Sequence, residues 1–260
     1  MGVLNVTPDS FSDGGRYADP GRAVERARQM ADEGADLIDV GGESTRPGAP
    51  RVSLAEELRR VLPVIRAVRA ELRLPISVDT TKAEVAARAI EAGAELVNDV
   101  SAGLGDREML PLVARTGKAI VLMHRRGTPR TMQRLARYGD VVRDVKRHLE
   151  RRVTAALTAG ISRDAIAIDP GIGFAKNLRH NLTLLAHLDE LATLGVPIVV
   201  GVSRKSFLGR LLGVPLEERV EATVAASLLA VQNGASIVRV HDVAPFARAL
   251  RVAGAIWAAR

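Results

Sequence analysis

The sequence contains no cysteine, few aromatic residues and no long apolar run. The absence of cysteine excludes disulfides, thiolate metal sites and cysteine nucleophiles. Aromatic residues make up only 3% of the 260 residues, which leaves few rings for stacking nucleic-acid bases. No apolar run approaches the length of about eighteen residues that a membrane span needs, and no basic segment precedes the run that begins at Gly2. We therefore expect neither a membrane span nor a signal peptide, and we predict a cytoplasmic location.

Lysine is scarce in a chain that carries a net charge of +7, because only five of its 37 basic residues are lysines. The arginines alternate with acidic residues in helix-like segments such as 22–36 and form no dense basic block. This pattern argues against a nucleic-acid partner and is compatible with an anionic small substrate. A non-catalytic basic binding protein is the alternative, and it would show steeply salt-dependent binding to nucleic acid.

Short apolar runs alternate with helical patterns along the whole chain. The eight runs begin near residues 2, 36, 75, 95, 118, 165, 197 and 236, and helical patterns include 20–34, 53–72, 82–93, 140–160 and 216–234. Apolar strands separated by helices indicate a parallel sheet covered on both faces. Eight such units predict an α/β fold with a single domain over residues 1–260, a (β/α)8 TIM barrel. An open doubly wound sheet is the alternative, although no Gly-x-Gly-x-x-Gly follows an early strand.

Polar residues lie at the ends of all eight predicted strands, where a barrel carries its active site. Each has an ordinary structural explanation: Asp79 or Ser203 caps a helix, Asn98 or Asp169 closes a turn, and His241 is a hydrogen-bonded structural histidine. Their coincidence is harder to explain, because burying polar groups in apolar runs costs free energy unless they find partners. A polar ligand in the mouth of the barrel would supply those partners.

Two kinds of ligand group fit these residues. Asp79, Asn98 and Asp169 offer acceptors for a flat heterocycle with several N–H donors, and Lys205 donates to a ring nitrogen or carbonyl. A second set of cations and donors suits phosphate or pyrophosphate, and it consists of Arg46, Arg239 and His241.

An oxygen ligand and two missing motifs complete this interpretation. The amide oxygen of Asn5 suits Mg²⁺, which takes few protein ligands. No cluster has the spacing of a zinc site, and the absence of Gly-x-Ser-x-Gly argues against acyl transfer.

Eight motifs in this order resemble the dihydropteroate synthase family over essentially the whole chain. They are MGVLNVTPDSFSDGG, DVGGESTRPGA, SVDTTK, VNDVSAG, VLMHRRGTPRTMQ, DPGIGFAK, GVSRKSFLG and RVHDV. The resemblance implies a transferase of folate biosynthesis and a sulfonamide target. It would join 6-hydroxymethyl-7,8-dihydropterin diphosphate to p-aminobenzoate by carbon–oxygen cleavage, releasing pyrophosphate and 7,8-dihydropteroate. It also implies Mg²⁺ as cofactor and a homodimer. The apolar segment 222–232 fits a dimer surface and fits the core of the chain equally well.

The resemblance also implies a role for individual residues. The implied pterin-binding residues are Asp79, Asn98, Met123, Asp169 and Lys205. The implied diphosphate-binding residues are Asn5, Arg46, Arg239 and His241, with Asn5 also the metal ligand. The implied p-aminobenzoate environment is Thr45, Arg46, Pro47, Phe174 and Ser206, while Phe11 and Asp13 belong to a first loop that closes over the leaving group. The implied catalytic residues are Asp79, Lys205, Arg239 and His241.

Two positions depart from the family pattern. Arg125 stands where methionine is common and Ala175 where glycine is common, and we expect neither to touch the proposed contacts. Two other barrels remain as alternatives. A pterin-dependent methyltransferase domain would share the Asp/Asn set but lack the STRPG, SRKS and RVHDV motifs. A phosphate-binding aldolase would need a lysine inside a strand at a Schiff-base position, and none is present.

Overall fold

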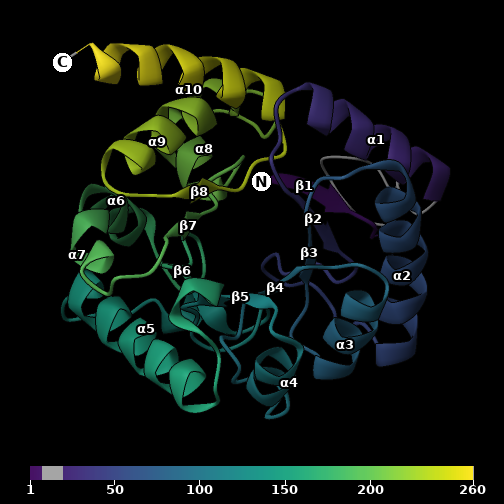
Figure 1. Ribbon diagram of the computed structural model, residues 1–260. Helices are drawn as coiled ribbons and strands as arrows, with labels where there is room; N and C mark the ends of the chain where they lie inside the picture. Colours follow the sequence, from purple (N-terminus) through teal and green to yellow (C-terminus); the bar gives the residue numbers. More distant parts are fainter. Residues whose placement is uncertain (8–19, 260) are drawn as a thin grey trace.

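The computed structural model describes residues 1–7 and 20–259, and it shows parallel strands arranged in a ring with helices outside (Figure 1). The strands are β1 (Gly2–Asn5), β2 (Ile38–Gly41), β3 (Ile76–Asp79), β4 (Leu96–Asp99), β5 (Ala119–Met123), β6 (Ile166–Asp169), β7 (Val199–Val200) and β8 (Ile237–Val238). They correspond to the eight predicted apolar runs. Six strands form one parallel sheet in the order β1 to β6, and β7 pairs in parallel with β8.

Two single bridges close these sheets into a barrel. Ile168 bridges to Ile198 between β6 and β7, and Gly2 bridges to Val240 beyond β8. The backbone N–H of Val3 donates to the carbonyl oxygen of Val240 at 2.9 Å, so the first strand pairs with the last. The predicted (β/α)8 barrel is therefore confirmed, and the open doubly wound alternative is wrong.

The helices surround the ring. They are α1 (Pro20–Asp32), α2 (Leu54–Glu71), α3 (Ala83–Glu91), α4 (Met109–Thr116), α5 (Val141–Thr158), α6 (Leu178–Ala186), α7 (Leu188–Ala192), α8 (Ser206–Leu212), α9 (Val220–Gln232) and α10 (Val243–Ala258), with short 3₁₀ turns η1 (Met132–Leu135) and η2 (Arg163–Ala165). Within residues 1–7 and 20–259, no helix has the length and apolar character needed to cross a bilayer.

Three helices have a side-chain cap at their N-terminus. Ser53 accepts a hydrogen bond from the backbone of Glu56 at the start of α2, Asp140 caps α5, and Asn177 forms a capping box at α6. The expected caps at Asp79 and Ser203 are not made, because α3 and α8 begin without a side-chain cap. These two polar side chains are therefore available for other contacts.

The barrel interior is apolar in its middle and polar at the carboxyl ends of the strands. Val121, Ala167 and Val199 form a small buried cluster, separate from the large core between strands and helices. Because side chains of a strand alternate between its faces, residues two positions further on point to the same interior. The predicted polar residues at the strand ends therefore lie above this apolar plug, in the mouth of the barrel.

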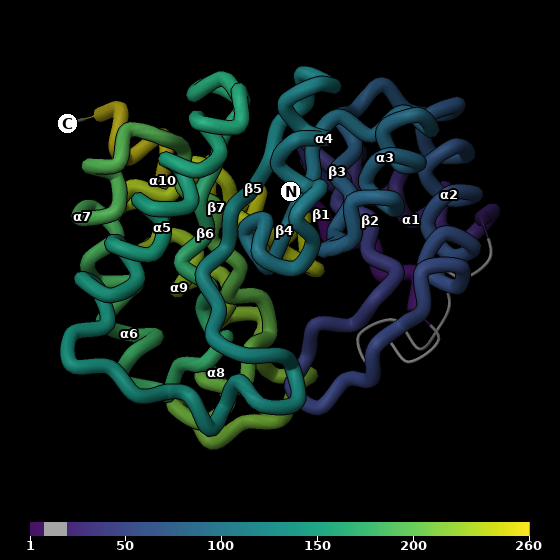
Figure 2. Tube along the Cα trace, turned by 90° about the horizontal axis from the view of Figure 1, so that it is seen from below, coloured from purple at the N-terminus to yellow at the C-terminus, as the bar shows by residue number. Residues whose placement is uncertain are grey.

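Two long connections pass beside this mouth. Figure 2 shows the β2–α2 connection (residues 42–53) running close to the β5–α5 connection (124–140). The backbone N–H of Gly48 donates to the carbonyl oxygen of Pro129 at 3.0 Å, which ties the two connections together. Both connections therefore contribute side chains to the space above β2 to β5.

Candidate active site

Arg239 is the centre of an ion cluster in the barrel mouth. Its Nε donates to Asp39 at 2.6 Å and its terminal nitrogen to Asp79 at 3.0 Å. The Asn98 amide also donates to Asp39, at 3.2 Å. Both carboxylates and Asn98 are buried. Because the Asn98 nitrogen is directed at Asp39, its carbonyl oxygen remains as an acceptor for a ligand.

The burial of Asp79 changes its protonation. Burial raises the pKa of Asp79 to about 7, and the adjacent Asp39 charge raises it further while Arg239 opposes the shift. The carboxyl group is thus poised to exchange a proton near neutral pH. A group with this property in a binding cleft is a candidate for contact with a heterocycle whose charge changes.

Asp169, Met123 and Lys205 form the other half of the mouth. Met123 and Asp169 are direct partners in the β5–β6 register, and Asp169 accepts a hydrogen bond from the backbone of Gly171 at 2.6 Å. The expected turn at Asp169 is therefore present. Burial also raises the pKa of Asp169, and the positive charge of Lys205 opposes that shift.

Lys205 approaches this half from the β7–α8 connection. Its Nζ donates to the carbonyl oxygen of Ile172 and lies 5.0 Å from the centroid of the Phe174 ring. Burial lowers the pKa of Lys205 to about 8, while the Asp169 charge acts in the opposite direction. The fold therefore places Lys205 between a predicted pterin ligand and Phe174, a predicted neighbour of p-aminobenzoate.

His241 lies close enough to Arg239 and Arg46 to feel the charge of both. The Nδ1 of His241 is 3.0 Å from the Ser203 hydroxyl oxygen, so the histidine makes the expected structural hydrogen bond. Burial lowers the pKa of His241 to about 3, and the charges of Arg239 and Arg46 lower it further. The imidazole is therefore neutral at physiological pH and is available as a hydrogen-bond donor or acceptor rather than as a cation.

Asn5 lies near Asp79 across a glycine. A Cβ on Gly41 would stand 3.7 Å from the Asn5 side-chain oxygen and 3.8 Å from an Asp79 carboxylate oxygen. Both side-chain oxygens therefore lie beside Gly41. Within the described part of the chain, no group of three His, Cys, Asp or Glu side chains has the arrangement of a metal site. A hard cation here would therefore rely on Asn5, Asp79, water and ligand oxygens.

The residues predicted for p-aminobenzoate lie on three different connections. Thr45, Arg46 and Pro47 are in the β2–α2 connection, Phe174 is half-buried in the β6–α6 connection, and Ser206 is exposed at the start of α8. Phe11 and Asp13, the predicted closing residues, lie outside the described residues.

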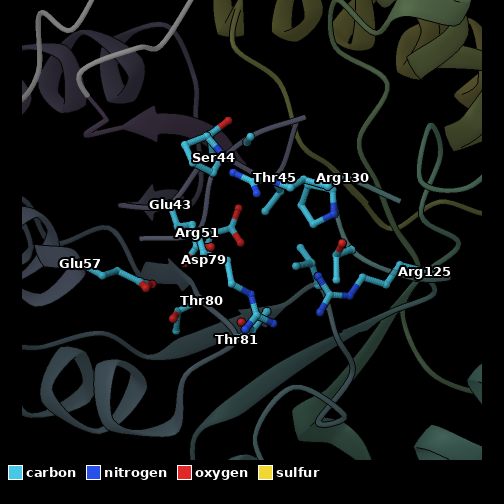
Figure 3. Close-up of a pocket in the computed structure, with 15 residues that line it drawn as sticks. Glu43, Ser44, Thr45, Arg51, Glu57, Asp79, Thr80, Thr81, Arg125 and Arg130 are labelled. Carbon is cyan, nitrogen blue, oxygen red and sulfur yellow. The ribbon is translucent and has the colours of Figure 1, made fainter. Parts of the chain in front are cut away.

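A cavity of about 340 Å³ opens beside Asp79, above β2 to β5 (Figure 3). Its lining residues are Glu43, Ser44, Thr45, Ala49, Pro50, Arg51, Glu57, Asp79, Thr80, Thr81, Val100, Arg125, Thr128, Pro129 and Arg130. Two predicted site residues, Asp79 and Thr45, are among them. Arg125, one of the two departures from the family pattern, lines the same cavity.

Sequence reasoning also missed a buried lysine next to the site. Lys176 Nζ donates to the carbonyl oxygen of Phe174 at 2.9 Å and lies 2.9 Å from His124 Nδ1. Burial holds the pKa of Lys176 well below its usual value. The motif DPGIGFAK ends in this lysine, but the spacing of the motif does not indicate that the lysine side chain will be buried.

The fold and the site together define a TIM-barrel enzyme that binds a donor-rich heterocycle next to an anionic group. The family model described as pterin binding enzyme matches residues 1–241. The chain belongs to this pterin-binding family, and its relatives within it are dihydropteroate synthases.

Three of these relatives illustrate the similarity. The Synechocystis sp. dihydropteroate synthase is 50% identical over 258 residues, covering 99% of this chain and 89% of the relative. The Yersinia pestis dihydropteroate synthase, solved in a sulfonamide drug complex, is 45% identical with a TM-score of 0.96, covering 99% of this chain and 94% of that one. The Xanthomonas albilineans enzyme was solved with 4-aminobenzoic acid (50% identity, TM-score 0.92, 99% and 92% covered) and with 7,8-dihydropteroate (47%, 0.89, 99% and 93%).

Proposed function

We propose that the chain condenses 6-hydroxymethyl-7,8-dihydropterin diphosphate with p-aminobenzoate to give 7,8-dihydropteroate and pyrophosphate. One observation carries this proposal: the Asp79–Arg239–Asp39 ion cluster and Asn98 lie together in the mouth of the barrel. The chain that forms this cluster belongs to the pterin-binding family. The Xanthomonas albilineans relative was solved with one of these substrates, 4-aminobenzoic acid, and with the product, 7,8-dihydropteroate.

The acceptors of the mouth would bind the pterin. The Asp79 carboxyl, the Asn98 carbonyl oxygen and the Asp169 carboxyl can accept from the N–H groups of the ring and its amino substituent. Lys205 can donate to a ring nitrogen or carbonyl oxygen, and Met123 provides an apolar surface for the ring face. A buried carboxylate at Asp79 would also favour a pterin that becomes transiently cationic as its side-chain bond breaks.

The bond that breaks joins the pterin methylene carbon to the ester oxygen of the diphosphate. The electron pair leaves with the diphosphate, the amine nitrogen of p-aminobenzoate forms the new bond to carbon, and that nitrogen then loses one proton. An aryl amine is already nucleophilic near neutral pH, so positioning it and excluding water is sufficient. Arg46, Arg239 and the neutral imidazole of His241 would stabilise the charge that develops on the leaving group.

Mg²⁺ fits the oxygen donors of Asn5 and Asp79, which both lie beside Gly41. When bound, it would neutralise part of the negative charge of the diphosphate. The expected result is that inorganic pyrophosphate binds more weakly in EDTA than in excess Mg²⁺, and that Asn5→Leu reduces this difference. Equal affinity for pyrophosphate in both conditions would contradict the metal assignment.

Incubation with both substrates and Mg²⁺ tests the overall activity. We expect dihydropteroate and pyrophosphate in equal amounts, and a large loss of pterin affinity in Asn98→Leu, which removes one acceptor while retaining side-chain volume. The exposed Asp189→Asn serves as a matched control. A folded protein that forms no dihydropteroate would overturn the proposed function.

A homodimer through α9 and α10 is the expected assembly. The two helices pack together on the outside of the barrel (Figure 1), and they expose Leu229, Val252 and Ile256, each by more than half of its surface. The residues of α9 are apolar around most of its circumference, which is typical of a helix covered on both sides. A second copy with the same face would cover these side chains.

Light scattering tests the assembly. We expect twice the 27.8 kDa mass of the chain, and a shift toward the monomer in Leu229→Glu. A monomeric wild-type protein at micromolar concentration would contradict the proposal. The cytoplasmic location stays a prediction, which cell fractionation would test.

A further inference from the structure

The cavity beside Asp79 has three arginines and three carboxylates in its lining, but they are not paired with each other. Lys82 donates to both Glu43 and Glu57, and Arg239 donates to Asp79. Neither cation belongs to the cavity lining. The hydrogen-bonding capacity of the carboxylates is thus directed to cations outside the cavity.

The arginines of the lining lack such partners. Within residues 1–7 and 20–259, the side chains of Arg51, Arg125 and Arg130 make no hydrogen bond or ion pair. Figure 3 shows Arg125 entering from the side of the cavity opposite Glu43 and Asp79. Arg125 is half-buried, whereas Arg51 and Arg130 are exposed at the rim.

The electrostatics of the cavity favour an incoming anion. Burial lowers the pKa of Arg125, and the Arg51 charge lowers it too, although the charges of Asp99, Glu43 and Asp79 act in the opposite direction. A partly desolvated guanidinium group close to another guanidinium is unfavourable unless an anion lies between them.

We infer that Arg125, with Arg51 and Arg130, forms a second oxyanion subsite that binds a phosphate group. The three arginines line one cavity from the β2–α2 and β5–α5 connections, and each guanidinium group can donate two parallel hydrogen bonds to phosphate oxygens. The hydroxyl groups of Thr81 and Thr128 line the same space. A single carboxylate would satisfy one arginine, whereas a diphosphate has enough oxygens for several.

This subsite differs from the predicted diphosphate site of the reaction. That site consists of Arg239, His241, Arg46 and Asn5, and Arg239 is already paired with two carboxylates. Arg125 lines a cavity beside Asp79, and none of these four residues lines it. The assignment of pyrophosphate as the natural ligand of this subsite rests on the proposed function, because that reaction releases pyrophosphate. The binding of an oxyanion by the three arginines does not depend on the proposed function.

Calorimetric titration with inorganic pyrophosphate tests the inference. We expect two binding events in the wild-type protein and loss of one of them in Arg125→Met. Arg51→Met should weaken the same event about tenfold, because one charge-assisted contact is removed. Arg107→Met removes an arginine that is almost fully exposed outside the cavity, so it serves as the control and should retain both events.

Several outcomes are decisive. An Arg125→Met isotherm identical to that of wild type and Arg107→Met, with native circular dichroism, would overturn the subsite. If Arg125→Met instead weakens p-aminobenzoate and leaves pyrophosphate unchanged, the site takes an aryl carboxylate and the phosphate assignment is wrong. If pyrophosphate binding depends on Arg125 but the wild type forms no dihydropteroate, the subsite stands and only the proposed function fails.

Discussion

The ionisation of Asp79 should make the stability of the folded protein depend on pH. Burial raises the pKa of this carboxyl from its ordinary value of 3.8 to about 7. Between these two values the folded protein holds a proton that the unfolded chain has released. The stabilisation from this proton is present below pH 4 and is lost as pH rises to 7, so this group makes the protein less stable toward neutral pH.

The size of this effect follows from the shift. Between pH 5 and pH 7 each pH unit removes about 1.4 kcal/mol, and above pH 7 the loss is complete. From pH 5 to pH 8 the contribution of Asp79 to the free energy of unfolding should therefore fall by about 3 kcal/mol. Asp79→Asn carries no titrating group at this position, so the variant should lack this fall.

Urea denaturation followed by circular dichroism at pH 5 and pH 8 measures the difference. We expect the stability of Asp79→Asn relative to wild type to rise by about 3 kcal/mol between the two pH values. Asp189→Asn, an exposed substitution on α7, should show no such change. A difference between wild type and Asp79→Asn that is the same at both pH values would refute the reasoning that burial dominates the ionisation of Asp79.

Two further predictions concern residues that hold the loops of the site. Gly171→Ala should cost at least about 3 kcal/mol of unfolding free energy, because its Cβ would stand 1.9 Å from the His124 carbonyl oxygen at a φ of 69°. Gly213→Ala has a similar φ of 71° and open space, so it should cost only about 1 kcal/mol; equal losses in denaturation would contradict the steric argument. Lys82→Met leaves Glu57 buried without its cation and should destabilise by about 3–5 kcal/mol at pH 8, and by less as the pH falls, because burial raises the pKa of Glu57 and a protonated carboxyl group needs no cation. Adding Glu57→Gln to this variant should recover most of the loss. If urea titrations show no recovery, the stabilisation by Lys82 does not come from its pairing with Glu57.

The local pattern of the sequence was sufficient for the elements and for much of the site. Alternation of short apolar runs with helical segments predicted eight strands, since these periodicities depend only on near neighbours. A polar residue at the carboxyl end of a strand, such as Asn98 or Asp169, reaches the mouth of any closed parallel barrel. The site was therefore predictable as a list of strand ends, and Asn5 belongs to it for the same reason.

Local spacing did not predict what each polar side chain would contact. Asp79 and Ser203 fit the pattern of helix caps, yet Asp79 pairs with Arg239 and Ser203 contacts His241. A short polar residue before a helix has the same local signal in both cases. The competing partner comes from a distant strand, so the sequence near Asp79 carries no information about it.

The surroundings of Arg125 could not be predicted from local sequence either. Its neighbours in the sequence place it after β5, but its exposure to the cavity depends on how the β2–α2 connection, tied through Gly48 to Pro129, encloses that space. The sequence by itself determined the order of strands and helices, because hydrogen bonding and burial along one element follow a short repeat. Only closure of the barrel decided the ion pairs, the shifted pKa values and the cavity, because these arise from groups up to 200 positions apart that share a buried, poorly hydrated space.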